Sequence, residues 1–323
     1  MENTRSDDVI VVGSGVIGLT TAVVLAERGR RVRVWTREPA ERATSAVAGA
    51  LWWPYRIEPE ALAGEWALQS LSVYEELAER PATTGVRMVD GVLAGSRLDA
   101  QGPWAARVPG LRAASPEEYA GIGLRARLPL IDMPVHLQWL RERFTAAGGT
   151  VETRTVTDLA RVAAPVVVNC TGLGARTLVP DPAVRPVRGQ LVITENPGID
   201  SWIVATDKSA GTSTYVFPQP DRLVLGGTTD EDDWSLTPDP VAAARIVERC
   251  AALRPEIAGA HVLGHLVGLR PVRTPVRLER EVRADGRIVV HHYGHGGAGV
   301  TVAWGCAREA AALAGGEDPA AAR

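Results

Sequence analysis

A glycine-rich turn near the N-terminus constrains the fold of this chain more than any other feature. Residues 9–12 are a continuous β-branched run, and residues 13–18 (GSGVIG) follow it directly. Apolar spacing predicts a helix over residues 19–28 after the turn, and a second strand over residues 32–35. A strand, a glycine turn, a helix and a strand in this order are typical of the βαβ unit of a Rossmann-like, dinucleotide-binding fold.

The spacing of the glycines and of two charged residues indicates how a dinucleotide would bind. Gly13 allows the tight turn, Gly15 lets a pyrophosphate approach the backbone, and Gly18 lets the helix pack closely on the strand. The helix N-terminus would then face the phosphates. Glu38, 20 residues after Gly18, suits the ribose hydroxyls, whereas Arg37 beside it would suit the 2′-phosphate of NADP. The motif alone therefore leaves FAD, NAD and NADP open.

Composition excludes several classes of protein. The chain has 323 residues, of which 46% are hydrophobic, enough for a large core in one domain or in two intertwined ones. With 35 basic against 38 acidic residues and no long run of like charge, it lacks the basic surface of a nucleic-acid binder. No apolar run approaches a membrane span, and the first residues lack the pattern of a signal peptide. We therefore expect a cytoplasmic protein with a small-molecule partner and with neither nucleic acid nor a membrane as partner.

Cysteine and histidine spacing argues against a metal site. The three cysteines are far apart and lack the spacing of metal ligands, so we expect buried, reduced thiols. His291, His292 and His295 are close in sequence but fall in a glycine-rich turn. Metal ligands usually converge from a helix or from paired strands. The sequence therefore predicts no metal, and assigns these histidines to packing.

The rest of the chain predicts a second, more mixed unit. A helix over residues 61–79 is followed by segments up to residue 128 that are rich in Gly, Pro and Arg and have no clear period. Closely spaced β-branched segments after residue 190 favour an antiparallel sheet. We expect one discontinuous unit over residues 1–57, 129–184 and 269–323, and a second over residues 58–128 and 185–268. Further strands are expected over residues 151–156, 166–171, 191–194, 201–205, 214–217, 223–227 and 288–291, and further helices over residues 135–147, 241–253 and 300–313.

Three later stretches decide between the cofactors. Residues 44–55 (TSAVAGALWWPY), 169–172 (NCTG) and 291–307 (HHYGHGGAGVTVAWGCA) follow the N-terminal turn in a fixed order. In order and spacing, over nearly the whole chain, the four motifs closely resemble the D-amino-acid oxidase family, which includes the D-aspartate oxidases. The resemblance implies an α/β fold in which a Rossmann-like FAD-binding domain carries a mixed α+β substrate domain built on an antiparallel sheet. It also implies FAD as the cofactor.

The resemblance assigns FAD-binding roles to particular residues. Thr44 and Ser45 would lie near the phosphates, Val156 against the adenine, and Thr301 near the flavin O2 end, where a helix N-terminus favours the anionic reduced ring. For Thr44, Ser45 and Thr301, ordinary helix capping or turn bonding stays open as the alternative. The implied FAD-binding residues are Gly13, Gly15, Val16, Ile17, Gly18, Arg37, Glu38, Thr44, Ser45, Gly49, Ala50, Leu51, Val156, Gly172, Gly296, Gly297, Gly299, Val300 and Thr301.

A carboxylate clamp is the expected core of the substrate site. An α-amino acid presents a carboxylate, which a planar guanidinium binds through two hydrogen bonds. By resemblance Arg270 is this guanidinium, Tyr215 adds its hydroxyl, and the backbone carbonyl of Gly297 accepts from the amine. Arg273 and Arg277 remain competitors for the role of Arg270. The apolar walls of the pocket are expected from Leu51, Trp53, Tyr55 and Phe217.

Two departures from the family pattern bear on specificity. Animal relatives carry a second tyrosine on a lid, where this chain has Gly211 in a short segment over residues 208–214, so lid gating is in doubt. Members specific for acidic substrates have an arginine after the Gly-Gly-Thr turn, where this chain has Thr229. Four acidic residues, 230–233, follow. They would repel acidic substrates if the loop faces the pocket, which favours neutral D-amino acids.

The expected activity is therefore FAD-dependent oxidative deamination of neutral D-amino acids by hydride transfer from Cα to flavin N5. The products are 2-oxo acids, ammonia and hydrogen peroxide. The expected partners are a D-amino acid and O2, with a homodimer as the candidate assembly. Two alternatives stay open: a glycine or sarcosine-type amine oxidase on the same fold, and a flavin- or NADP-binding module without catalytic activity.

Overall fold

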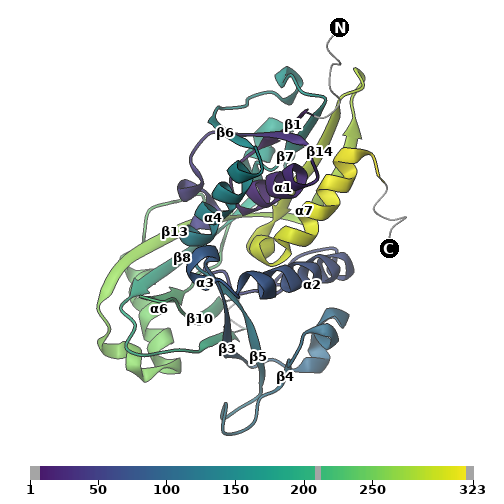
Figure 1. Ribbon diagram of the computed structural model, residues 1–323. Coiled ribbons are helices and arrows are strands. Elements are labelled where there is room, and N and C mark those ends of the chain that lie inside the picture. The colour runs from purple at the N-terminus through teal and green to yellow at the C-terminus, as the bar shows by residue number, and fades with distance from the viewer. Residues whose placement is uncertain (1–7, 208–211, 318–323) are drawn as a thin grey trace.

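One mixed sheet runs through the chain (Figure 1), which this computed structural model describes over residues 8–207 and 212–317. The strands are β1 (Asp8–Val12), β2 (Arg31–Thr36), β3 (Val86–Ala94), β4 (Arg112–Ala113), β5 (Gly123–Ile131), β6 (Thr150–Thr153), β7 (Val166–Asn169), β8 (Arg185–Thr194), β9 (Trp202–Asp207), β10 (Thr212–Pro218), β11 (Leu223–Gly226), β12 (Asp230–Glu231), β13 (Val262–Val282) and β14 (Ile288–His295). The α-helices are α1 (Val16–Glu27), α2 (Glu60–Leu77), α3 (Pro81–Thr84), α4 (Met133–Ala146), α5 (Ala175–Leu178), α6 (Pro240–Leu253) and α7 (Gly299–Gly315). The order of the strands in the sheet is β4-β5-β3-β9-β10-β11-β8-β13-β14-β7-β1-β2-β6, and β12 pairs with β8.

The parallel half of the sheet confirms the predicted βαβ unit. The strands β14, β7, β1, β2 and β6 lie in this order and run parallel to one another. Val9 and Val11 of β1 belong to the large core that includes residues of α1, α4 and α7, whereas Ile10 and Val12 belong to a second cluster on the other face. A strand that is buried on both faces has no polar side, which explains its continuous β-branched run.

The antiparallel half confirms the predicted second sheet but is larger than predicted. β8, β11, β10 and β9 pair antiparallel in this order, and β9 then pairs with β3, which pairs with β5. β3 and β5 lie where the sequence shows no clear period. Their polar positions pair with each other: Asp90 contacts Arg125 at 3.0 Å and Arg127 at 3.2 Å. One segment taken alone carries no sign of these cross-strand partners.

Strand β13 joins the two halves. It is 21 residues long and pairs antiparallel with β8 over its first part and with β14 over its last part. The register shifts between Val272 and Arg277. So long a strand could not be predicted from the sequence, because Pro271 and Pro275 interrupt it and proline is typical of edges and irregular points of a sheet.

The predicted division into two units stays a prediction, because elements cross the expected boundaries. β5 spans the boundary at residues 128 and 129, and β13 spans the one at 268 and 269. Helix α2, which was assigned to the second unit, packs against α7 of the first. One hydrophobic core holds residues of both units together.

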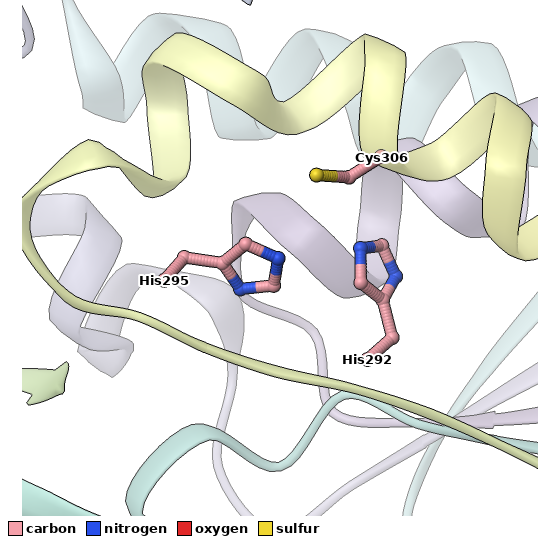
Figure 2. A group of neighbouring side chains, drawn as sticks. All are labelled: His292, His295 and Cys306. Carbon is pink, nitrogen blue, oxygen red and sulfur yellow. The ribbon is translucent and has the colours of Figure 1, made fainter. Parts of the chain in front are cut away.

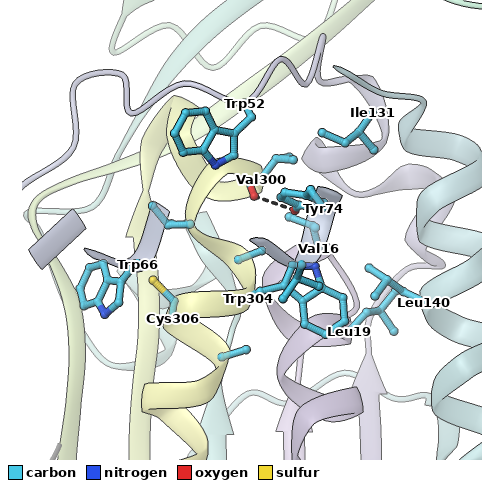
Figure 3. Packing of buried hydrophobic residues seen from close by; sticks show 14 of the residues in the cluster. Val16, Leu19, Trp52, Trp66, Tyr74, Ile131, Leu140, Val300, Trp304 and Cys306 are labelled. Carbon is cyan, nitrogen blue, oxygen red and sulfur yellow. Dashed lines mark hydrogen bonds between the residues drawn. The ribbon is translucent and has the colours of Figure 1, made fainter. Parts of the chain in front are cut away.

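The contact between α2 and α7 fixes where α7 begins. The Gly305 amide donates to Ser70 Oγ at 3.0 Å, and the Tyr74 hydroxyl donates to the Val300 carbonyl at 2.8 Å (Figure 3). A Cβ on Gly305 would lie 2.4 Å from the Trp66 backbone, so the two helices touch through their main chains. Burial raises the pKa of Tyr74, which keeps its hydroxyl protonated as a donor.

We predict that Gly305→Ala destabilises the fold by about 1–3 kcal/mol, the usual cost of overpacking a core. The Cβ has no space unless α2 moves away from α7. Urea unfolding measures the change in the free energy of unfolding. Gly315→Ala on the same helix is the control, because its Cβ would meet only the Glu317 side chain at 3.5 Å. Equal losses in both variants would contradict the proposed close contact.

Candidate active site

The glycine turn has the tight geometry that its sequence predicts. Gly13 has a φ of +111°, and a Cβ there would lie 2.5 Å from the Cys170 carbonyl oxygen. A Cβ on Gly18 would lie 2.0 Å from the Gly13 carbonyl oxygen. Ser45 Oγ accepts from the Val16 amide at 3.0 Å, so it caps α1. Of the two roles left open for Ser45, the structure contains the capping bond, at the helix end where phosphate is expected.

The end of β2 is tied to the glycine turn. Ser14 Oγ lies 2.8 Å from Thr36 Oγ1, and Thr36 donates to the Glu38 carbonyl at 2.6 Å. The Glu38 carboxylate pairs with the Arg37 guanidinium at 3.1 Å, and both side chains are exposed. The candidate ribose-binding acid is therefore held beside the turn but is already paired with its neighbour.

The strand predicted over residues 151–156 is wrong in its bounds, because β6 ends at Thr153. The Arg154 amide donates to the Thr36 carbonyl at 2.8 Å, and its guanidinium lies 3.8 Å from the centroid of Trp35. These contacts turn the chain away from the sheet edge. Val156, the expected adenine contact, lies beyond the strand and packs against the cluster that contains Trp35.

Residues 44–53 lead from the start of α1 to the start of α7. Gly49 lies against two aromatic rings, since a Cβ there would be 2.9 Å from Phe217 and 3.3 Å from Tyr215. Ala50 has a φ of +58°, and Leu51 bridges to Leu130. These contacts place the predicted flavin-binding stretch beside the predicted substrate residues.

The Thr301 hydroxyl is bound to the main chain of Trp53. It donates to the Trp53 carbonyl at 3.0 Å and accepts from the Trp53 amide at 3.1 Å. Gly299, two residues earlier, lies near α1: a Cβ on Gly299 would be 3.9 Å from the Ile17 side chain. The N-termini of α1 and α7 therefore lie side by side, with Trp53 fastened to the second.

Arg270 is the centre of the predicted carboxylate clamp. Its Nη1 donates to the carbonyls of Thr228 at 3.2 Å and Arg188 at 3.4 Å. Its guanidinium covers Gly189, where a Cβ would lie 2.5 Å from a guanidinium nitrogen. A Cβ on Gly297 would lie 3.5 Å from Arg270 Cδ, so this turn lies beside the arginine.

The competing arginines are paired, whereas Arg270 is not. Arg273 binds Asp181 at 2.7 Å, and Arg277 binds Glu279 at 2.7 Å. Within residues 8–207 and 212–317, no carboxylate lies within ion-pair distance of Arg270. Arg270 is half-buried and has no anionic partner, so of the three arginines it is the one that can receive a substrate carboxylate.

Tyr215 lies close to Arg270. Burial raises the pKa of Tyr215, and the guanidinium of Arg270 opposes the shift. The hydroxyl therefore stays protonated near neutral pH and can donate a hydrogen bond. Its ring lies over Gly226, where a Cβ would approach the ring within 2.0 Å, so a larger residue at 226 would displace it.

Several of the residues predicted to form the pocket walls are aromatic and make ring contacts. Tyr215 and Phe217 stack with centroids 4.5 Å apart, and Tyr55 contacts the Gly297 turn, at 3.5 Å from a Cβ position there. Trp53 packs edge to face on the buried Trp104, with centroids 4.9 Å apart. Sequence patterns gave no sign of Trp104, which comes from a stretch without a period. Gly189 was also missed, although a glycine inside a strand often marks a close approach of this kind.

The acidic loop over residues 230–233 is paired with arginines. Asp230 and Asp233 contact Arg188 at 3.1 Å and 3.7 Å, and Glu231 contacts Arg185. Because both arginines lie on β8, part of the negative charge of the loop is compensated there. The absent lid tyrosine cannot be examined, since Gly211 lies outside the described residues.

The residues expected to hold FAD form one continuous path. It begins at the glycine turn and Ser45, passes Gly49, and ends at Gly297 and Thr301 beside Arg270. Gly15 leaves room for a phosphate, since a Cβ there would meet Ser45 Oγ at 3.3 Å. Gly172 and Gly296 have φ values of +54° and +55°, so their turns favour glycine. A long ligand with phosphates at one end and a flat ring at the other fits this path.

No helix in the described part of the chain is both long and apolar enough to span a membrane.

Comparisons with known proteins agree with this geometry. A family model described as FAD dependent oxidoreductase matches residues 8–313. D-amino-acid oxidase from Streptomyces coelicolor is 73% identical over 315 residues, which cover 97% of this chain and 98% of that protein. D-amino-acid oxidase from Rubrobacter xylanophilus is 47% identical over 312 residues, which cover 95% of each chain.

A solved structure shows the same fold. The crystal structure of glycine oxidase from Geobacillus kaustophilus has a TM-score of 0.81 to this chain, over 97% of this chain and 95% of its own, at 19% identity. The predicted α/β fold and the predicted FAD cofactor are thereby confirmed, and the family resemblance with them. This chain belongs to the D-amino-acid oxidase family of FAD-dependent oxidoreductases.

Proposed function

We propose that this enzyme oxidises neutral D-amino acids to 2-oxo acids, with release of ammonia and hydrogen peroxide. The observation that carries the proposal is the unpaired guanidinium of Arg270, close to Tyr215 and to the Gly297 turn. This arrangement supplies a cation and a hydroxyl donor for a carboxylate, beside main chain that can accept from an amine. The D-amino-acid oxidases from Streptomyces coelicolor and Rubrobacter xylanophilus support the same substrate class.

The carboxylate determines how the substrate is oriented. Arg270 binds it through two parallel hydrogen bonds, and Tyr215 adds a third donor. The Gly297 carbonyl accepts an N–H from the amine. With the carboxylate and the amine both held, the Cα hydrogen can point in only one direction. Positioning therefore supplies most of the rate enhancement.

FAD supplies the chemistry that the side chains lack, because when bound it accepts the Cα hydride at N5 and passes the electrons to O2. The protein has to hold the amine in its neutral form and keep water from the reacting carbon. Leu51, Trp53 and Phe217 form an apolar wall that serves this second task. The imino acid then hydrolyses in water to the 2-oxo acid and ammonia.

Preference for neutral side chains is proposed from the pocket walls, since the acidic loop is already paired with arginines. Trp53, Trp104 and Phe217 offer apolar surface, which favours apolar side chains over charged ones. Arg56 lies 5.3 Å from the centroid of Tyr55, but it is exposed, where water and salt screen its charge. An acidic side chain would therefore lose hydration without gaining a buried partner.

Two further proposals concern the setting of the enzyme. We propose that it works in the cytoplasm and that it assembles as a homodimer. A glycine or sarcosine-type oxidase is the second candidate, but the glycine oxidase structure is only 19% identical and supports the fold alone.

The colour of the purified protein tests cofactor and chirality together. We predict a yellow protein that D-alanine bleaches in the absence of air, because D-alanine reduces the bound flavin. L-alanine should leave the colour unchanged, and D-methionine should be oxidised faster than D-aspartate, glycine or sarcosine. Faster turnover of sarcosine than of any D-amino acid would refute the proposed substrate class.

We predict that Arg270→Ala loses about 2–5 kcal/mol of substrate binding, because it removes one partner of a buried charge pair. The flavin spectrum should persist, since Arg270 is not expected to hold FAD. Arg270→Lys should recover only part of the loss, because an ammonium lacks the planar fork. Arg280→Ala, at an exposed position of the same strand, is the control for steady-state kinetics with D-alanine. Unchanged catalytic efficiency in Arg270→Ala would assign the clamp to another residue.

Tyr215→Phe should weaken substrate binding by about 1.5–3 kcal/mol, the usual worth of a hydrogen bond to a charged group. The ring stack with Phe217 is retained, so the fold and the FAD content should not change. Anaerobic titration with D-alanine measures the affinity directly. Tyr119→Phe is the matched control, because Tyr119 packs against a different buried cluster, the one that contains Ala243 and Ile246 of α6. A variant that binds as tightly as the native protein would show that the hydroxyl does not contact the carboxylate.

A further inference from the structure

Two histidines and a cysteine converge in the interior, beside the turn that contains Gly297. His292 and His295 lie on β14 and Cys306 lies on α7, and all three are buried. One potential ligand atom from each lies within 4.8 Å of the other two. Figure 2 shows both imidazole rings and the thiol turned toward one space between the strand and the helix. The proposed oxidase reaction uses none of the three side chains.

Hydrogen bonding determines which nitrogen of His292 is free. Thr21 Oγ1 donates its proton to the Ile17 carbonyl at 2.7 Å. It also lies 3.2 Å from His292 Nδ1, and Cys170 Sγ lies 3.9 Å from the same nitrogen, so Nδ1 is the ring nitrogen with polar neighbours. We assign the proton of the neutral ring to Nδ1, which then donates to Thr21 and leaves the lone pair on Nε2. Nε2 is buried and has no hydrogen-bond partner in the structure.

This arrangement is the one that metal-binding histidines adopt. In such sites the second ring nitrogen donates to a neighbouring group, which fixes the tautomer and the ring orientation. Thr21, on α1, serves that purpose for His292. Burial lowers the pKa of His292 well below its ordinary value and that of His295 to about 3, so both rings are neutral near pH 7.

The second histidine adds another unsatisfied atom. Nε2 of His295 is also buried and has no hydrogen-bond partner. Unpaired buried polar atoms are rare in folded proteins, and a bound ion is one of the few explanations for them. What distinguishes these two atoms from other buried unpaired atoms, such as His136 Nε2 and His291 Nδ1, is that both histidines converge on the same thiol.

We propose that His292, His295 and Cys306 form a binding site for a thiophilic divalent cation, with Zn²⁺ as the ion tested. Imidazole nitrogen and thiolate sulfur are preferred zinc ligands, whereas Mg²⁺ and Ca²⁺ require oxygen. Binding converts the Cys306 thiol to a thiolate: the S–H bond breaks, a sulfur–zinc bond forms, and one proton leaves to solvent.

The geometry requires only a small contraction. Zn–N bonds of about 2.0 Å and Zn–S bonds of about 2.3 Å place ligand atoms roughly 3.5 Å apart. The present separations of up to 4.8 Å exceed this by about 1 Å, which side-chain torsions can supply. The ligands come from a strand and from the helix packed on it, so the sequence-based reason for excluding a metal does not apply to this trio.

Zinc at this position would fasten the start of α7 to β14. His295 directly precedes the turn that contains Gly297, and a Cβ on Gly299 would lie 3.6 Å from His295 Cβ. Bound zinc would therefore make this corner more rigid and raise the melting temperature. The site stands on its own residues, independently of the proposed substrate.

Metal content of the holoenzyme tests the proposal directly. The FAD-loaded protein is freed of metal with a chelator, mixed with Zn²⁺, separated from unbound ions by gel filtration, and analysed for zinc per chain. We expect close to one zinc per chain and a higher melting temperature. Co²⁺ in place of zinc should give intense d–d absorption at longer wavelength than the flavin absorption. Such absorption is expected for low-coordinate cobalt with a thiolate ligand.

Substitutions locate the bound ion. His292→Asn and Cys306→Ala should each lose the zinc and the cobalt absorption, while His291→Asn and Cys250→Ala should keep both. His291 is the neighbouring buried histidine, bound to Glu281 at 2.9 Å, and Cys250 is a buried cysteine elsewhere. The flavin spectrum verifies that each variant is folded.

Two results would overturn the proposal. One is native holoenzyme that retains no zinc after gel filtration. The other is equal retention by the native protein and by folded Cys306→Ala, which would assign the ion to the exposed His261 and His265.

Discussion

Strand β13 is the constraint on which the rest of the structure depends. Its first part extends the antiparallel sheet and its last part extends the parallel one, so both halves share one hydrogen-bonded ladder. Arg270 lies in the part paired with β8, and the strand then reaches β14, which leads into the Gly297 turn. The distance between the carboxylate clamp and the expected flavin path is therefore set by main-chain hydrogen bonds, which are more rigid than a contact between separate lobes.

The second constraint is the meeting of three segments at the start of α7. Trp53 is bound by Thr301, Tyr74 binds the Val300 carbonyl, and Gly299 lies near Ile17. Each contact joins residues that are far apart in sequence. Together they bring the pocket wall, the helix N-terminus and the glycine turn into one place. The same packing buries His292, His295 and Cys306 deeply enough to leave two ring nitrogens without partners.

Local patterns in the sequence were enough to predict much of the fold. The βαβ unit follows from its β-branched run and glycines, and the helices α2, α4, α6 and α7 fall within two residues of their predicted bounds at either end. β3 and β5 could not be predicted, because their charged positions are satisfied by partners on another strand. The extent of β13 was hidden by two prolines, and β6 ends early because Arg154 turns toward Trp35.

The candidate site also has residues that could be predicted from the sequence and residues that could not. Arg270 could be singled out by its local sequence frame, but only Asp181 and Glu279 show why Arg273 and Arg277 are already engaged. The pairing of the acidic loop with Arg185 and Arg188 depends on β8, more than 40 residues away, and it compensates part of the negative charge that the loop carries. No sequence pattern points to Trp104, because its role arises from one edge-to-face contact with Trp53.

The double hydrogen bond from Thr301 to the Trp53 peptide also has an evolutionary consequence. It fixes the main chain at this point of the pocket and makes no use of the side chain there. The side chain at residue 53 can therefore change without a change in the position of the main chain. A family with this arrangement can change its substrate range by exchanging one side chain, without rebuilding the path along which the cofactor lies.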